Sequence, residues 1–327
     1  MTGTQNASCA DRPGEQGFIL VTVIGVLLIL AIVAASLMLA SRTEIKARAV
    51  LGGQAELAAL ADGIVRLAAL RVVARQTSVE TAARLPVDGT PMRCVDGATV
   101  VTIRVNDTNG LIDLNNASGD VLEMLLIGSG KVLPDAVRLA AAILDFRDAD
   151  DVPGPNGAES QAYQQAGRPY GPKNAVFESI DELDQVLGMT PDLLEQLRPL
   201  VTVHSRSTAI DPGVAPVELL QVLMRGMAAR SGLVESEVPL TREQFRAPPQ
   251  LLTRSSPRTQ SRAASRTYVI GATASRGEWH FSRQAVIEIS QRSETGFVVR
   301  SWSAHADATR AKRPGGVGLP RCDDSNW

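Results

Sequence analysis

The stretch from Phe18 to Ala40 carries no charged residue and consists mostly of valine, isoleucine, leucine and alanine. As an α-helix it would reach roughly 35 Å, because each residue adds about 1.5 Å along the axis, and this length crosses the apolar core of a bilayer. Helical spacing of apolar residues continues past Arg42 as far as Val73, and no proline interrupts the run. The sequence therefore predicts one long helix whose first part, 18–40, spans a membrane.

A cleaved secretory signal is the alternative interpretation of this run. The small residues of "ASLMLAS" offer a cleavage site. However, a signal peptide has no need for the helical pattern that continues afterwards, whereas a membrane-anchored assembly subunit does. The charges do not help the choice of orientation, since Arg42, Lys46 and Arg48 outweigh the positive charge that precedes the run.

A short polar leader, 1–17, precedes the apolar helix and ends in Gly17, with Phe18 next. This arrangement resembles the N-terminus of type IV pilins and of type II secretion pseudopilins. The resemblance implies that a prepilin peptidase cuts between Gly17 and Phe18, and that the new amino terminus is N-methylated. It also implies an inner-membrane protein with a single span and a periplasmic head. The leader departs from the family's basic pattern, because Arg12 stands against two acidic residues.

The fifth residue after the predicted cut is Thr22, where most pilin-like subunits carry glutamate. A glutamate in the apolar helix bundle is tolerable only beside a neighbour's charged amino terminus, because an unpaired buried charge is very expensive. A subunit with no neighbour ahead of it has no such amine to neutralise, and a threonine there can bond back to a carbonyl one turn earlier. Thr22 is therefore consistent with a position as the first subunit, at the filament tip. It is equally consistent with a residue that is merely tolerated in a membrane helix.

Strand patterns flank a helical block in the rest of the chain. Residues 98–106 alternate β-branched and polar side chains, which predicts a strand. Helices are predicted from Pro134 onward, after a capping-box pair of Ser179 and Glu182, and after Thr190. Three further strands, "RTYVIGATASR", "EWHFSRQAVIEISQR" and "GFVVRSWSA", predict an antiparallel meander joined by short turns.

These patterns predict an α+β fold in which the long N-terminal helix packs on an antiparallel pilin-like sheet. Residues 41–112, with the amphipathic helix and the first strand, and residues 236–306, with the last strands, would form that domain. Residues 113–235 would be an inserted all-α domain, because strands flank an entirely helical block. The tail, 307–327, shows no apolar periodicity and is expected to be disordered.

The inserted block carries a second and more specific resemblance. The segments "NDTNGLIDLNNAS", "AAAILDFRDADDVPGPNGAES" and "AYQQAGRPYGPKNAVFESIDELDQVLGMTPDLLEQLRPLVTVHS" are similar to the minor pseudopilin K family of type II secretion. The resemblance implies a SAM-like helical domain inserted into a pilin-type α/β domain. It also implies calcium, a place at the pseudopilus tip, and assembly with other minor pseudopilins and the major pseudopilin. The segment "AIDPGVAP" departs from the asparagine-rich pattern that is usual in the family.

Acidic residues gather in "LDFRDADDVPGPNGAE", which predicts a structural calcium site. Starting from Asp148, Asp150 stands at the third place and Glu159 at the twelfth, which is a partial calcium-loop spacing that also takes in Asp151. Pro153 occupies the sixth place, where an EF-hand needs glycine, so this is no EF-hand. Hard oxygen ligands on such a loop suit calcium better than a soft metal. A solvated acidic loop is the alternative, and acid–base catalysis is disfavoured because no nucleophile or oxyanion-hole motif accompanies the carboxylates.

Binding of nucleic acid and enzymatic activity are both disfavoured by the sequence. The segment "LDQVLGMTPDLLEQL" resembles a helix-hairpin-helix, but the acidic residues around it repel phosphate, and the formal net charge of the chain is −2. The alternative function is a DNA-uptake component that binds DNA through this hairpin. A hydrolase held by a signal helix is a further alternative, which the absence of a catalytic motif disfavours. The predicted function is a non-enzymatic minor pseudopilin.

The three cysteines, Cys9, Cys94 and Cys322, show no metal-ligand spacing. Removal of the leader would discard Cys9 and leave the other two in an oxidising compartment. Because Cys322 lies in the tail that is expected to be disordered, two free thiols are predicted, with a disulfide between Cys94 and Cys322 as the alternative.

Overall fold

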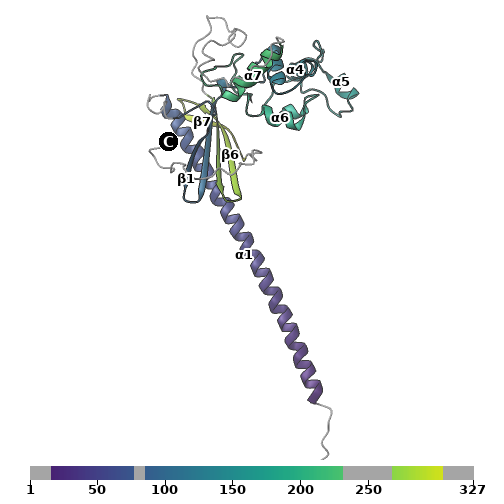
Figure 1. The fold of residues 1–327 in the computed structure, drawn as a ribbon, viewed down its shortest axis with the longest axis vertical. Helices are drawn as coiled ribbons and strands as arrows, with labels where there is room; N and C mark the ends of the chain where they lie inside the picture. Colours follow the sequence, from purple (N-terminus) through teal and green to yellow (C-terminus); the bar gives the residue numbers. More distant parts are fainter. Residues whose placement is uncertain (1–15, 77–84, 231–266, 305–327) are drawn as a thin grey trace, which may run out of the picture. The chain divides into compact units, whose positions relative to one another are not determined.

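The computed structural model describes residues 16–76, 85–230 and 267–304. The chain divides into two units, 1–56 and 57–327, and several of its helices and strands are labelled in Figure 1. The N-terminal part of the leader, the serine- and arginine-rich stretch before the last strands, and the predicted disordered tail, 307–327, all lie outside the described residues.

One helix, α1 (Gln16–Arg75), confirms the predicted long N-terminal helix. In the first unit, every side chain described between residues 20 and 36 is exposed. Among the residues that could be examined for this property, no helix combines the length and the apolarity that crossing a membrane requires. The membrane span over 18–40 therefore stays a prediction.

Within the second unit, a five-stranded antiparallel sheet packs against the C-terminal part of α1 (Figure 1). Its spatial order is β1-β2-β5-β6-β7. The strands are β1 (Met92–Asp96), β2 (Thr99–Asp107), β5 (Thr267–Arg276), β6 (Trp279–Ile289) and β7 (Phe297–Ala304). The predicted meander of the last three strands is confirmed, and β2 agrees with the strand predicted over 98–106. The short strand β1 was not predicted.

Strand alternation decides which face of the sheet meets the helix. In β2, the side chains of Val101, Ile103 and Val105 are almost fully buried, whereas the residues between them are more exposed. From α1, Val65 and Val72 lie in the same core cluster. Since burial of such a side chain contributes about 1.5–3 kcal/mol, this helix-on-sheet layer has a core of its own.

Residues between β2 and β5 build a separate helical domain around a second core. It begins with the 3₁₀ turn η1 (Thr108–Gly110), and its two short strands, β3 (Ile112–Asp113) and β4 (Val201–Thr202), pair in parallel. Its other helical elements are α3 (Gly119–Gly128), α4 (Leu133–Arg147), α5 (Ser160–Gln165), η2 (Ile180–Gln185), α6 (Pro191–Leu197) and α7 (Val217–Arg230).

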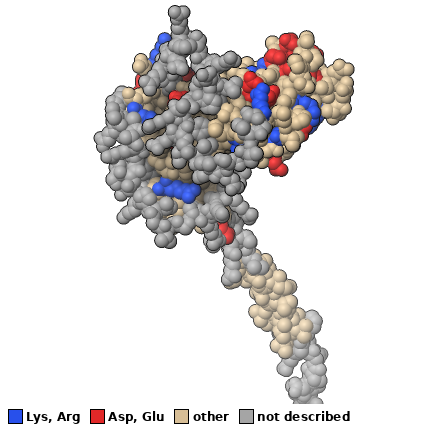
Figure 2. All heavy atoms as spheres, turned by 45° about the horizontal axis from the view of Figure 1, so that its top comes forward, with Lys and Arg blue, Asp and Glu red and all other residues tan. Residues whose placement is uncertain are grey.

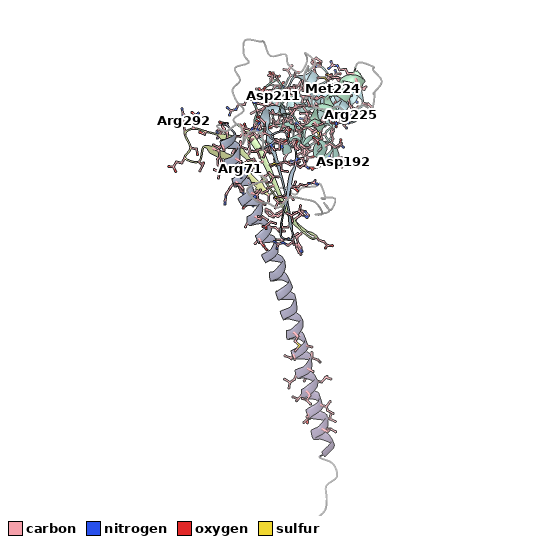
Figure 3. All side chains as sticks on the ribbon, turned by 60° about the vertical axis from the view of Figure 1, so that its left-hand side comes forward. Arg71, Asp192, Asp211, Met224, Arg225 and Arg292 are labelled. Carbon is pink, nitrogen blue, oxygen red and sulfur yellow. The ribbon has the colours of Figure 1, made fainter. Side chains whose placement is uncertain are left out.

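Two glycines allow α3 and α7 to cross at very short range. A Cβ atom on Gly226 would lie 2.0 Å from the carbonyl oxygen of Met124, and one on Gly128 would lie 1.9 Å from that of Val222. Both obstacles are backbone atoms and cannot move aside cheaply. Arg225, which Figure 3 labels on α7, donates to the carbonyl of Gly128 at 3.2 Å and ties the crossing further.

The chain leaves the sheet at the end of β2, forms the helical domain, and returns to the sheet at the start of the neighbouring strand β5. The Thr108 hydroxyl, just after β2, donates to the carbonyl of Thr267 at the start of β5, at 3.0 Å. The backbone N–H of Asp211, labelled in Figure 3, donates to the carbonyl of Asn109 at 2.8 Å. Since β2 and β5 pair directly, the helical domain is an insertion into a continuous sheet.

The hairpin that resembled a DNA-binding motif is built from a 3₁₀ helix and a short α-helix. The capping box of Ser179 and Glu182 is present at the start of η2, as predicted. Thr190 caps α6 by accepting from the N–H of Leu193. The Asp181 carboxylate pairs with Arg198 at 2.6 Å, so an acidic residue of the hairpin ties η2 to the end of α6.

The prediction of a free thiol at Cys94 is wrong, because Cys94 is disulfide-bonded. It lies on β1 with 4% of its surface exposed, within the core between sheet and helix. The other cysteines, Cys9 and Cys322, both lie outside the described residues. The prediction rested on the expected disorder of the tail that carries Cys322, and a sequence that is expected to be disordered does not prevent a cysteine from forming a disulfide.

Candidate metal centre

The candidate metal centre forms where α4 ends and α5 begins. Asp145 lies in the last turn of α4, and Asp148 is the residue at which that helix stops. The acidic loop, residues 148–159, then returns the chain so that Glu159 stands just before the first residue of α5. Two short helices therefore bring carboxylates from both ends of the loop to one place.

Asp145, Asp148 and Glu159 each contribute one carboxylate oxygen to a group in which these atoms lie within 4.8 Å of one another. Asp145 and Glu159 are each only 4% exposed, whereas Asp148 is exposed. Figure 2 shows acidic side chains gathered on the surface of the helical domain. The group thus has two buried ligands and one that faces water.

Among the described residues, no cationic side chain compensates the charges of this group. Neither carboxylate oxygen of Glu159 has a hydrogen-bond partner. Burial above all, and then the neighbouring charges of Asp145 and Asp148, raise the pKa of Glu159 to about 7. Burial also raises the pKa of Asp145. In the described part of the chain no lysine or arginine forms an ion pair with these three residues, and Arg147 instead donates to the carbonyls of Leu114 and Ala117.

Two glycines shape the cradle around Asp145. A Cβ atom on Gly157 would lie 1.9 Å from Asp145 Oδ2, so no other residue fits there without moving the carboxylate. The N–H of Gly154 donates to the same oxygen at 3.3 Å. These contacts hold the Asp145 carboxylate beside Glu159 although both groups carry the same charge.

The residues fit a hard cation. Buried carboxylates without partners are costly unless they are protonated or coordinate a metal. Oxygen ligands in an irregular loop suit calcium, whose coordination is flexible, better than magnesium. A cation held here would cross-link the end of α4 to the start of α5.

The structure assembles the acidic residues differently from the sequence prediction. It brings Asp148 and Glu159 together with Asp145, and it does not bring Asp150 or Asp151 into the group. The carboxylate of Asp150 accepts from the N–H of Val152 at 2.9 Å, while Asp151 accepts from the hydroxyl of Ser160 at 2.7 Å. Both side chains therefore stabilise the local backbone. The spacing counted from Asp148 could not show whether a carboxylate in this segment has that role or coordinates a metal.

Asp145 was missed as a candidate ligand because the calcium-loop spacing was counted from Asp148. A signal was present in the sequence, since Asp145 belongs to the apolar face of α4 with Ala142 and Phe146, and a carboxylate on a buried face needs a partner. The other predicted site residues lie in α1. Gly17 and Phe18 are in its first turn, and Thr22 is exposed in the isolated chain.

Comparison with known proteins points to one family. The family model described as type II secretion system, protein K, matches residues 102–206, which include the whole candidate metal centre. The type II secretion system protein K of Pectobacterium carotovorum subsp. carotovorum is 31% identical over 137 residues, which cover 40% of this chain and 42% of the relative. The protein K of Pseudomonas aeruginosa is 27% identical over 242 residues, or 65% of this chain and 69% of the relative.

The fold is also shared with a solved structure. The crystal structure of the GspK-GspI-GspJ complex from the enterotoxigenic Escherichia coli type 2 secretion system contains a chain that matches with a TM-score of 0.51 and 17% identity. The match covers 80% of this chain and 99% of that one. The match spans less than half the length of the Pectobacterium relative, but both relatives are described as type II secretion system protein K. The family model and both relatives carry the same description, so this chain is similar in sequence to the type II secretion system protein K family, and it shares its fold with the solved chain.

Proposed function

We propose that this protein is a minor pseudopilin at the tip of a type II secretion pseudopilus, where it nucleates assembly and takes part in secretion across the outer membrane. The observation that carries the proposal is the helical domain inserted between β2 and β5, two paired strands of a sheet packed on α1. A pilin-like layer enlarged in this way has a bulky head that would block a further subunit from adding above it. The proposed role is steric and associative, without catalysis.

The N-terminal region would supply the anchor. The uncharged run from Phe18 to Ala40 belongs to α1, and its described side chains from 20 to 36 are exposed. Exposed apolar side chains on a helix without a partner need an apolar environment, which the inner membrane supplies before assembly and neighbouring helices supply afterwards. The head, 57–327, would lie in the periplasm.

Thr22 fits the position at the tip. A subunit that has no neighbour ahead of it gains nothing from a buried glutamate, because no amino terminus is present to pair with the carboxylate. An uncharged threonine avoids that cost. The leading subunit of a filament is therefore the one for which Thr22 in place of glutamate is least harmful.

Processing tests the anchor part of the proposal. A prepilin peptidase would cut between Gly17 and Phe18 and leave an N-methylated Phe18, so Gly17→Val is expected to accumulate as the uncut precursor. Intact-mass measurement of the membrane fraction reads the difference directly. A mature protein that begins near Ala40 in the wild type would contradict the pseudopilin interpretation and favour a cleaved secretory signal.

Calcium is proposed as a structural cofactor. Asp145, Asp148 and Glu159 would hold it, and the cation would supply the positive charge that these carboxylates lack. The role of the chain's residues is to present one oxygen each from the two ends of the acidic loop. Occupancy would stabilise the helical domain, on which the proposed steric role depends.

Partners are proposed to be other minor pseudopilins and the major pseudopilin, and no binding of nucleic acid is expected. The solved relative is a complex of GspK with GspI and GspJ, so the counterparts of those two proteins are the first to test. Both hydrophobic cores lie within residues 57–327, so this segment is suitable as a soluble head.

Mixing the soluble head with the soluble heads of those counterparts is expected to give a stable complex in size-exclusion chromatography. Failure to form any complex in calcium-containing buffer would contradict the proposed place in the pseudopilus. Salt-dependent binding of DNA by the head in the same buffer would favour the DNA-uptake alternative instead.

A further inference from the structure

Three buried side-chain atoms in the described part of the chain have no hydrogen-bond partner, and they belong to two residues. Two of the atoms are the carboxylate oxygens of Glu159, and the third is Oδ1 of Asn174. A buried polar atom without a hydrogen-bond partner destabilises the folded state. Glu159 belongs to the candidate metal centre, whereas Asn174 comes from the connection between α5 and η2.

Asp151 links these two residues. Its carboxylate accepts from the N–H and the hydroxyl of Ser160, at 3.3 and 2.7 Å, and it also contacts the side chains of Glu159 and Asn174. A carboxylate accepts hydrogen bonds, so the Asn174 amide nitrogen is the donor in that contact. The amide oxygen of Asn174 then has no hydrogen-bond partner, and Asp151 lies between Asn174 and Glu159 and contacts both.

The backbone around Asn174 is held against the acidic loop. A Cβ atom on Gly171 would lie 3.0 Å from Ser160 Oγ, which shows how closely this connection passes the residue after Glu159. Lys173 pairs with Glu182 at 2.8 Å and fixes the adjacent position. Asn174 itself has φ +52, a left-handed conformation that asparagine adopts more readily than most residues.

We propose that the amide oxygen of Asn174 is a further ligand of the cation held by Asp145, Asp148 and Glu159, so that the cation joins the α5–η2 connection to the acidic loop. This inference rests on the proposed calcium site. Calcium takes six to eight oxygen ligands and accepts asparagine carbonyls as readily as carboxylates. A neutral fourth residue adds coordination without adding to the repulsion among three carboxylates.

Calorimetric titration of the metal-free soluble head with calcium tests the proposal. Asn174→Ala is expected to weaken calcium binding about tenfold or more, because it removes a ligand. Asn174→Asp is expected to bind calcium at least as tightly as the wild type, since it keeps an oxygen at the same place. If Asn174 acted only by donating to Asp151, the aspartate would lose that donor, add repulsion, and weaken binding as much as alanine does.

Asn156→Ala is the matched control. Asn156 also has a positive φ, +64, and lies in the acidic loop, but its side chain is exposed. Asn156→Ala should lose a similar preference for the left-handed backbone conformation, and its calcium affinity should stay within about twofold of the wild type. Melting of each variant in chelator separates a loss of fold from a loss of affinity.

Two outcomes would overturn the proposal, and they are distinguishable. Unchanged calcium affinity in Asn174→Ala would assign the orphaned oxygen to a buried water and leave the calcium site itself intact. A wild-type head that binds no calcium at all would overturn both this inference and the proposed cofactor.

Discussion

Removing calcium with a chelator is expected to lower the melting temperature of the soluble head, residues 57–327, by about 5–10 °C. A ligand that binds only the folded state stabilises it by about 2.7 kcal/mol when its free concentration is a hundred times Kd. For a domain of this size, each kcal/mol shifts the melting temperature by about 2–4 °C. The effect has a local cause, because without the cation the carboxylate of Glu159 remains buried beside Asp145 with no hydrogen-bond partner.

Variants distinguish coordination from general loop chemistry. Asp145→Asn and Glu159→Gln should lose most of the calcium response, because each removes a charged ligand of the group. Asp150→Ala is the matched control from the same loop, since Asp150 accepts from the N–H of Val152 and lies outside the group of three carboxylates, and it should keep most of the response. In chelator, Glu159→Gln should melt above the wild type, because the amide relieves a like-charge contact.

Magnesium should restore stability less well than calcium, since magnesium demands a nearly ideal octahedron and gives up its water reluctantly. Differential scanning calorimetry in chelator, calcium and magnesium measures all of these differences. Identical melting of the wild-type head in chelator and in millimolar calcium would show that the acidic group is an ordinary solvated surface.

A second large effect is expected from pH in the metal-free head. The pKa of Glu159 in the folded protein is about 7, above its ordinary value of 4.5. Between these two pH values the folded state binds more protons than the unfolded state, so the contribution of Glu159 to stability falls as pH rises. The free energy of unfolding should fall by about 3 kcal/mol over the whole interval, because a tenfold change in proton affinity is worth about 1.4 kcal/mol. Burial raises the pKa of Asp145 too, which acts in the same direction.

Urea unfolding of the head in chelator at pH 5 and at pH 7.5 measures this effect. The wild type should lose more stability between the two values than Glu159→Gln, and the difference between the two proteins isolates Glu159 from all other titrating groups. Saturating calcium should restore the stability that the wild type loses at pH 7.5, because a cation favours the ionised carboxylate, and it should do little for Glu159→Gln. Equal pH dependence of the two proteins in chelator would show that Glu159 is solvated and ionises normally.

Local sequence signals were sufficient where one segment decides its own structure. The uninterrupted helical pattern predicted α1, because no proline lies in it to remove a backbone donor. Alternation of apolar and polar residues predicted β2 and the last three strands, because a strand with one buried face shows this pattern in its own sequence. The capping box of Ser179 and Glu182 could also be predicted, because its two partners stand only three residues apart in the sequence.

The insertion of a helical domain into the sheet was predicted from the order of the patterns, although its details were not. The pairing of β2 with β5 follows once strands on both sides of a helical block must share one sheet. The strand β1 was missed because "MRCVD" is short and lies at the sheet edge, where its pairing with β2 supplies most of the information. The disulfide at Cys94 was likewise invisible, because only the folded chain brings two cysteines together.

The metal centre shows most clearly what the sequence by itself determined and what the tertiary structure decided. The sequence determined that several carboxylates lie within one short loop, and that their chemistry suits calcium. It could not select among them, because spacing along a loop does not say which side chains turn inward. The path of the loop does say so. With no side chain at Gly157 to block it, the loop groups Asp145 with Glu159, while Asp150 accepts from Val152 and Asp151 accepts from Ser160. Coordination depends on distances in space, and only the folded path of the chain from the end of α4 to the start of α5 sets those distances.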